Sequence, residues 1–95
     1  MKRYSIIQDK KQCYVCGTTK NIHIHEVYYG RNRQKSIEDG CCIFLCGIHH
    51  NLSNLGIHFN HELDARVKRE MEIKWCEYYN KTPEDFLKRY YINYL

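Results

Sequence analysis

Two short pairs of soft metal ligands stand out in this 95-residue chain. Two residues separate Cys13 from Cys16, two separate Cys46 from His49, and 29 residues lie between the pairs. Each pair can occupy two corners of a tetrahedron, and three thiolates with one imidazole form a common closed zinc site. The spacing therefore predicts a structural Zn²⁺ ion held by these four side chains.

A second group of chemically capable side chains consists of histidines and one amide. His50 directly follows the last expected zinc ligand, and Asn54 stands four residues later, on the same face of a helix. His23 and His25 alternate along an expected strand and so point to one face. His58 follows a few residues beyond. Convergence of several of these side chains would create a second cation site.

Three further cysteines have no spaced partner. Cys41 and Cys42 are adjacent, so a strand would point them to opposite faces. Cys76 lies beside the apolar stripe of an expected helix. We therefore expect all three to be small core residues.

Strands and a short helix must position the expected ligands. Residues 22–28 alternate and are rich in Ile, Val and Tyr, which predicts a strand. Residues 30–40 are polar and bounded by glycines, which is typical of a loop. Residues 41–46 form a short apolar run, hence a second strand, and residues 49–56 suit a short helix that ends at Gly56. Together they predict a ββα unit.

The remaining third of the chain has helical signals. Asn60 is a good N-cap, and Thr82 followed by Pro83 marks a second helix start. The last ten residues are rich in apolar side chains and should pack back on the core. An apolar stripe at helical period follows Asn60 and consists of Leu63, Val67, Met71, Trp75 and Tyr78.

We expect one domain over residues 1–95, because the chain is short. It would comprise a lead-in (1–12), a zinc knuckle with the ββα core (13–58) and a helical carboxy-terminal part (60–95). A chain of this size buries only about 60–65% of its unfolded surface. Only 43% of its residues are apolar, so a metal or disulfides must add stability.

The choice between metal and disulfides depends on the compartment. The first twelve residues lack the apolar run of a secretory signal, and no stretch approaches the roughly 20 apolar residues of a membrane span. We therefore expect a cytoplasmic protein with reduced thiols and no membrane partner, in which close cysteine pairs favour metal.

Charge is unevenly distributed along the chain. The net charge is +4, but residues 1–36 hold eight Lys/Arg and two Asp/Glu, whereas residues 37–95 hold seven and nine. A basic amino-terminal third is typical of a surface that faces nucleic-acid phosphates. A merely solvated, lysine-rich surface would give the same pattern.

The motifs CYVCG (13–17), IHIHEVYYGRNRQKSIEDG (22–40) and IFLCGIHHNLSNLGIHFNHELD (43–64) together resemble those of the HNH (ββα-metal) endonuclease superfamily. Small phage and prophage HNH-type proteins are the most similar members, and the resemblance extends to about residue 80. It implies an α+β fold: a small zinc-stabilised ββα-metal, treble-clef-like core followed by one long and one short helix. The implied activity is metal-dependent hydrolysis of DNA phosphodiester bonds, in a bacterial host cytoplasm if phage-encoded.

The resemblance also implies one catalytic divalent cation, such as Mg²⁺, Mn²⁺ or Ni²⁺, between the first strand and the short helix. His25 would be a ligand, and Glu26 stands where the general base, usually a histidine, is found. Alternatively, His25 is the base, and Glu26 orients it or binds the cation. His50 matches the helix histidine that faces the metal. The implied catalytic residues are thus His25, Glu26 and His50.

Other positions of the motif leave alternatives open. Asn54 matches the residue one helical turn after the metal-facing histidine, and Asn51 is the other candidate for the motif's asparagine. His58 would be a further ligand or a phosphate contact. Near the motif's middle asparagine, which braces the loop, the chain has Asp39 and Gly40.

DNA is the expected partner. Arg31, Arg33 and Lys35 would contact backbone phosphates, which gives affinity without sequence information. A rival interpretation is a non-catalytic zinc-containing DNA-binding accessory protein in phage recombination or packaging, and a weaker one is a toxin- or antitoxin-like interaction protein. The oligomeric state is open, although a carboxy-terminal segment with Tyr90, Tyr91 and Tyr94 offers a surface for a dimer.

Overall fold

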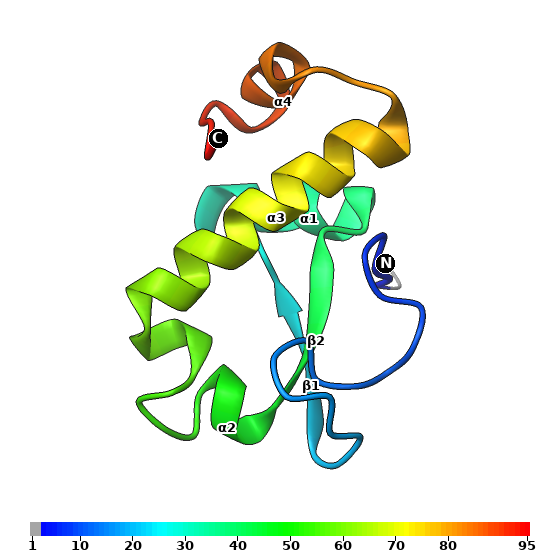
Figure 1. The fold of residues 1–95 in the computed structure, drawn as a ribbon. Coiled ribbons are helices and arrows are strands. Elements are labelled where there is room, and N and C mark those ends of the chain that lie inside the picture. The colour runs from blue at the N-terminus through cyan, green and yellow to red at the C-terminus, as the bar shows by residue number, and fades with distance from the viewer. Residues whose placement is uncertain (1–2) are drawn as a thin grey trace.

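A computed structural model describes residues 3–95, which form a two-stranded antiparallel sheet and four α-helices (Figure 1). Met1 and Lys2, the start of the expected lead-in, lie outside the described residues. The elements in chain order are β1 (Ile22–Glu26), η1 (Gly30–Asn32), α1 (Arg33–Asp39), β2 (Cys42–Cys46), α2 (Gly47–His50), η2 (Ile57–Phe59), α3 (His61–Tyr79) and α4 (Pro83–Tyr90).

The two strands lie within the segments predicted for them. They pair antiparallel, with Ile22 opposite Cys46 and Glu26 opposite Cys42. The start of β1 therefore lies beside the end of β2, where α2 begins. In Figure 1, α2 lies at this end of the hairpin and α1 at the other. Residues just before β1 and just after β2 are thereby brought together.

The prediction of a loop over residues 30–40 was wrong. The segment forms the 3-10 turn η1 and then helix α1, which ends at Gly40 in the left-handed conformation with φ 74°. Ser36 and Ile37 are buried, and their burial stabilises a helix whose other side chains are mostly polar. With only two inward residues in two turns, the segment lacks the apolar periodicity that marks a helix in sequence.

The short helix expected over residues 49–56 was also misplaced. Helix α2 begins at Gly47 and ends at His50, after a single turn. Asn51 leaves the helical conformation with φ −146°, although its N–H still donates to the carbonyl of Gly47. Asn54 therefore lies in an exposed turn and not one turn along a helix from His50.

Helix α3 begins where its sequence predicted. The side chain of Asn60 accepts a hydrogen bond from the N–H of Leu63. Four members of the predicted stripe are buried: Leu63, Val67, Met71 and Trp75. The prediction was wrong for the fifth, Tyr78, which is 56% exposed. Its neighbour Tyr79 turns inward instead and donates its hydroxyl hydrogen to the carbonyl of Asp39. The buried stripe therefore covers only the first four turns of the helix.

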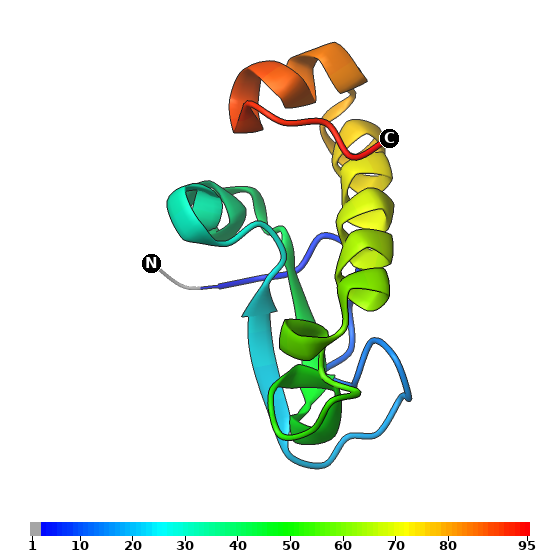
Figure 2. The same cartoon turned by 90° about the vertical axis from the view of Figure 1, so that its left-hand side faces the viewer.

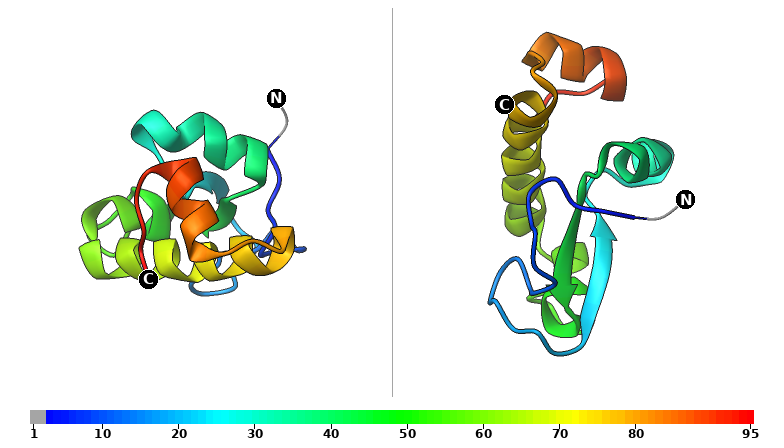
Figure 3. Two further views of the ribbon diagram at one scale, coloured as in Figure 1. Left: turned by 90° about the horizontal axis from the view of Figure 1, so that it is seen from above. Right: turned by 90° about the vertical axis from the view of Figure 1, so that its right-hand side faces the viewer.

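The carboxy-terminal segment packs back on the core, as expected. Thr82 and Asp85 form a reciprocal capping box at the start of α4, and Phe86 and Tyr90 are completely buried. Figure 2 shows α4 above α1 and α3, and the view from above in Figure 3 shows it between these two helices. The burial of Tyr90 removes it from the suggested dimer surface, whereas Tyr91 is exposed.

The carboxylate of Asp39 joins α1 to both carboxy-terminal helices. Asp39 accepts hydrogen bonds from the Trp75 indole (3.0 Å), from the Arg89 guanidinium (3.0 and 3.1 Å) and from the Tyr90 hydroxyl (2.8 Å). Removing this largely buried carboxylate would leave the Trp75 indole without its acceptor and would take one of its two carboxylate partners from Arg89. We expect Asp39→Ala to lower the free energy of unfolding by about 3 kcal/mol, measured by urea unfolding of the zinc-loaded protein.

The matched control is Glu38→Ala, which removes the other carboxylate that contacts Arg89. Glu38 has a side chain 41% exposed, and an exposed ion pair contributes only about 0–1 kcal/mol. Equal losses for the two variants would contradict the role given to Asp39.

Candidate metal centres

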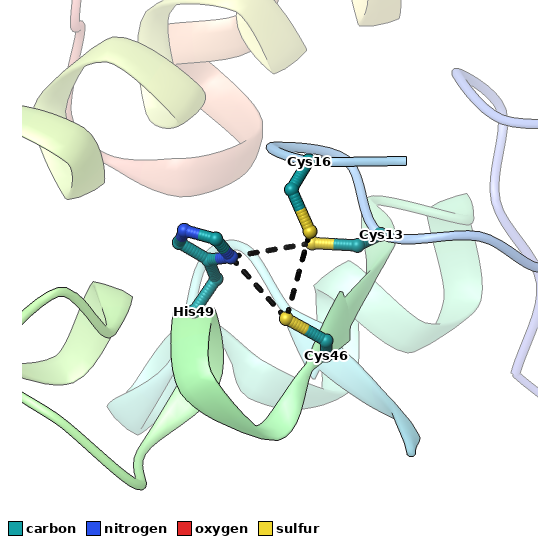
Figure 4. Close-up of side chains that lie close together, drawn as sticks. All are labelled: Cys13, Cys16, Cys46 and His49. Atoms are coloured by element: carbon teal, nitrogen blue, oxygen red, sulfur yellow. Dashed lines mark hydrogen bonds between the residues drawn. The ribbon is translucent and has the colours of Figure 1, made fainter. Parts of the chain in front are cut away.

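The four predicted zinc ligands converge at the end of the hairpin where β1 begins (Figure 4). Cys13 and Cys16 come from the turn that precedes β1, Cys46 ends β2, and His49 lies on α2. Their ligand atoms all lie within 4.8 Å of one another. The spacing in the sequence therefore corresponds to one cluster in space.

The separations of these atoms match those around a tetrahedral zinc ion. The Cys16 and Cys46 sulfurs are 3.8 Å apart, and His49 Nδ1 is 3.2 Å from Cys46 Sγ and 3.8 Å from Cys13 Sγ. Zinc–ligand bonds of about 2.3 Å to sulfur and 2.0 Å to nitrogen imply tetrahedral edges of about 3.8 Å between two sulfurs and about 3.5 Å between sulfur and nitrogen. The cluster could hold a metal ion such as zinc, with all four positions taken by protein.

Local electrostatics distinguish one member of the cluster, Cys13, from the buried cysteines outside it. Burial acts to raise the pKa of Cys13, but hydrogen bonds from the backbone at Cys16 and Cys46 outweigh it and lower this pKa to about 6. Burial raises the pKa of both Cys41 and Cys42 to about 12. Cys13 can thus be a thiolate at neutral pH, which is the ligand form. Cys41 and Cys42 are buried thiols, as predicted.

A second cluster joins three histidines from separate segments. His25 is buried on β1, His50 is half-buried at the end of α2, and His58 is exposed on η2. The Nε2 atoms of His50 and His58 are 3.1 Å apart. The ring centre of His25 lies 5.4 Å from the ring centre of His50 and 5.1 Å from that of His58. Two nitrogens bound at about 2.1 Å to one ion lie roughly 3.0–3.4 Å apart. The three imidazoles could therefore share one cation.

His25 is the most unusual member of this histidine cluster. Its Nε2 atom is buried and has no hydrogen-bond partner within residues 3–95. Burial, with the nearby His58 and His50, lowers its pKa to about 3, so the ring is neutral at pH 7. Neutral imidazole is the form that binds cations. An unpartnered buried nitrogen beside two other imidazoles fits a cation ligand.

Glu26 lies beside the histidine cluster but is not part of it. Its carboxylate accepts from Arg33 Nε at 2.7 Å and lies 3.4 Å from Arg3 Nε. None of its hydrogen bonds in the described part of the chain reaches His25, so the idea that it orients His25 gains no support. Glu26 does share a cavity of about 280 Å³ with the cluster. The polar residues that line this cavity are His25, Glu26, Tyr29, Arg33, His50 and His58.

The asparagine candidates lie outside this cavity. Asn51 and Asn54 are both exposed, and neither is among the residues that line it. The early end of α2 is the reason, because it turns the following chain away from the cluster. The structure thus brings His58, rather than Asn54, beside His50.

The three basic residues predicted to contact phosphate differ in availability. Arg31 is exposed on η1, and Arg33 borders the cavity. Lys35 donates to the carbonyl of Arg89 at 2.7 Å and lies 4.5 Å from the centre of the Tyr91 ring. Arg31 is therefore exposed to solvent, whereas Arg33 is ion-paired with Glu26 and Lys35 is engaged with the carboxy-terminal segment.

Two residues of the site lie outside the set of ligands and catalytic residues that the sequence predicts. His23 Nδ1 lies 3.0 Å from His50 Nδ1, and Tyr29 borders the cavity while its hydroxyl contacts Asp64 and Lys68. The signal for His23 was its shared strand face with His25. Nothing local marked Tyr29, whose position depends on packing against α3.

In residues 3–95, no helix is long and apolar enough to cross a membrane. No family model matches the chain, and no curated protein and no solved structure matches it significantly.

Proposed function

We propose that this chain is a metal-dependent HNH-type endonuclease that hydrolyses DNA phosphodiester bonds, related to small phage proteins of that superfamily. The observation that carries the proposal is the convergence of His25, His50 and His58 beside a zinc-type cluster. The knuckle, hairpin and α2 correspond to a treble-clef-like core in this proposal. The four-ligand cluster would be structural, because it has no open position for a substrate.

A divalent cation at the histidine cluster would neutralise charge on the scissile phosphate and stabilise the leaving oxygen. Three imidazoles favour ions such as Ni²⁺, Co²⁺ or Zn²⁺ over Mg²⁺, which prefers oxygen ligands, and Mn²⁺ lies between the two groups. The ligand set therefore supports Ni²⁺ and Mn²⁺ more strongly than Mg²⁺.

The base that activates water would be Glu26. If three imidazoles bind the cation, Glu26 is the carboxylate left on the same cavity wall. Arg33 holds one of its oxygens at 2.7 Å. A DNA phosphate in the cavity would compete for that guanidinium, and the freed carboxylate oxygen could then accept a proton from water.

The test is a supercoiled-plasmid assay with the zinc-loaded protein and added Mg²⁺, Mn²⁺ or Ni²⁺. Because one such site cuts one strand, we expect open-circular product with Mn²⁺ and Ni²⁺. Binding of DNA without cutting in any of the three metals would overturn the proposal.

That outcome would leave the rival function, a DNA-binding accessory protein without catalysis. One observation favours it: both oxygens of Glu26 are ion-paired, to Arg3 and to Arg33. A carboxylate whose two oxygens both contact guanidinium groups has no free oxygen for a water proton until one partner leaves.

Glu26→Gln separates these two functions. The amide keeps the shape of the side chain but cannot accept a proton, so we expect cutting to fall about 10²–10⁴-fold. DNA affinity, measured by gel shift, should stay within a few fold. Glu38→Gln, an exposed carboxylate on α1, is the control and should cut normally. Full activity of Glu26→Gln would move the base role to His25.

A further inference from the structure

His23 contacts the histidine cluster without belonging to it. It lies on β1, is half-buried, and presents its ring edge-on to His50, with centres 5.1 Å apart and planes at 85°. The two Nδ1 atoms are 3.0 Å apart, an ordinary hydrogen-bond distance. His23 is absent from the group whose ligand atoms lie within 4.8 Å of one another. Its contact is therefore with the ligand His50 and not with the ion position.

The two nitrogens of His50 face different partners. Nδ1 meets His23, whereas Nε2 meets His58 at 3.1 Å. A neutral imidazole carries one proton, on one of its two nitrogens. If Nε2 is to offer its lone pair to a cation, the proton must be on Nδ1. His50 Nδ1 is then the donor, and His23 Nδ1 must be the acceptor.

We propose that His23 is a positioning residue that accepts a hydrogen bond from His50 Nδ1–H and thereby holds His50 Nε2 toward the cation. This inference rests on the cation site of the proposed function, but not on DNA cutting. Such outer partners, commonly carboxylates or carbonyls, fix the tautomer and ring orientation of a ligating histidine. Here a second histidine has that role, two residues before the ligand His25.

The proposal assigns a donor and an acceptor to each hydrogen bond among His23, His50 and His58 when no cation is bound. With its proton on Nδ1, His50 can only accept at Nε2, so His58 Nε2–H is the donor across 3.1 Å. The chain of donors therefore runs from His58 to His50 to His23. Cation binding requires the His58 proton to leave Nε2, and the ring can take one at Nδ1 because His58 is exposed to water.

Two substitutions of His23 test the acceptor itself. His23→Asn carries an amide oxygen close to the position of Nδ1, whereas His23→Leu has a similar bulk and no acceptor. Ni²⁺ affinity is measured by calorimetry on zinc-loaded protein. We expect His23→Leu to bind Ni²⁺ about 10–100-fold more weakly and His23→Asn to stay within a few fold of wild type. Equal weakening in both variants, or none in His23→Leu, would overturn the proposal.

Nitrogen-15 NMR of the wild type gives a second readout that does not depend on the variants' folding. It should find the His50 proton on Nδ1 in the Zn²⁺-saturated protein, and coordination of His50 through Nδ1 would refute the assignment. Absence of any second bound cation in the wild type would refute it as well. Tight Ni²⁺ binding that depends on the His23 acceptor, with no DNA cutting, would instead overturn the nuclease proposal alone.

Discussion

His50→Ala is expected to reduce DNA cutting by about 10³-fold or more, the order of loss when one group that stabilises developing charge is removed. His50 stands at the centre of the proposed site. Its Nε2 lies 3.1 Å from that of His58, and its ring centre is 5.4 Å from that of His25. Alanine would leave two imidazoles for the cation, and the gap would admit water.

This loss should be catalytic and not structural. His50 is the last residue of α2 and is only half-buried, so its removal leaves little unfilled core. Zinc content and the melting temperature should therefore stay close to wild type. Gel-shift affinity for DNA should also persist, because backbone phosphates are bound chiefly by arginines and lysines.

His61→Ala is the matched control. His61 is an exposed histidine in the first turn of α3 and lies outside both clusters. It should cut DNA at the wild-type rate in the plasmid assay. Normal cutting by His50→Ala in Mn²⁺ and Ni²⁺ would remove the histidine cluster from the mechanism.

Removal of zinc is the change with the largest expected effect on the fold. Structural zinc sites contribute about 10–16 kcal/mol of apparent binding free energy at pH 7. A small domain has only about 5–15 kcal/mol of stability in total. Chelation should therefore abolish cooperative thermal unfolding, followed by circular dichroism.

Cys46→Ser should have the same effect, because Cys46 joins the end of β2 to α2 and contacts both Cys16 and His49. Elemental analysis should find one tightly held zinc per wild-type chain, apart from any exchangeable cation at the histidine cluster, and no tightly held zinc in this variant. Cys76→Ser is the control, since Cys76 is a half-buried thiol on α3 outside the cluster. It should retain its zinc and melt cooperatively. An unchanged melting curve after complete chelation would contradict a structural zinc.

Several features followed from the sequence because their signals are local. Only two residues separate Cys13 from Cys16 and Cys46 from His49, so most backbone conformations keep the two side chains of each pair close together. Asn60 caps α3 by a bond to a residue three positions on, and the Thr82 box closes within α4. Strand alternation and the α3 stripe are periodicities of a single element. Such patterns need no knowledge of the rest of the fold.

Only the tertiary structure decided how the site is completed. Helix α1 exists because two of its side chains are buried by the core, and α2 ends after one turn, which turns Asn54 away. His58 reaches His50 across the mostly irregular segment 51–57, and Glu26 meets Arg3 and Arg33 from different segments.

These contacts depend on packing between distant parts of the chain. The free energy of burying a side chain depends on the residues that cover it. Local sequence patterns do not show which residues those are. The cluster of Cys13, Cys16, Cys46 and His49 is thus determined by spacing within two short pairs and by the strand pairing that joins them. The roles proposed for His23, Glu26 and His58 depend on which surfaces the folded chain brings together.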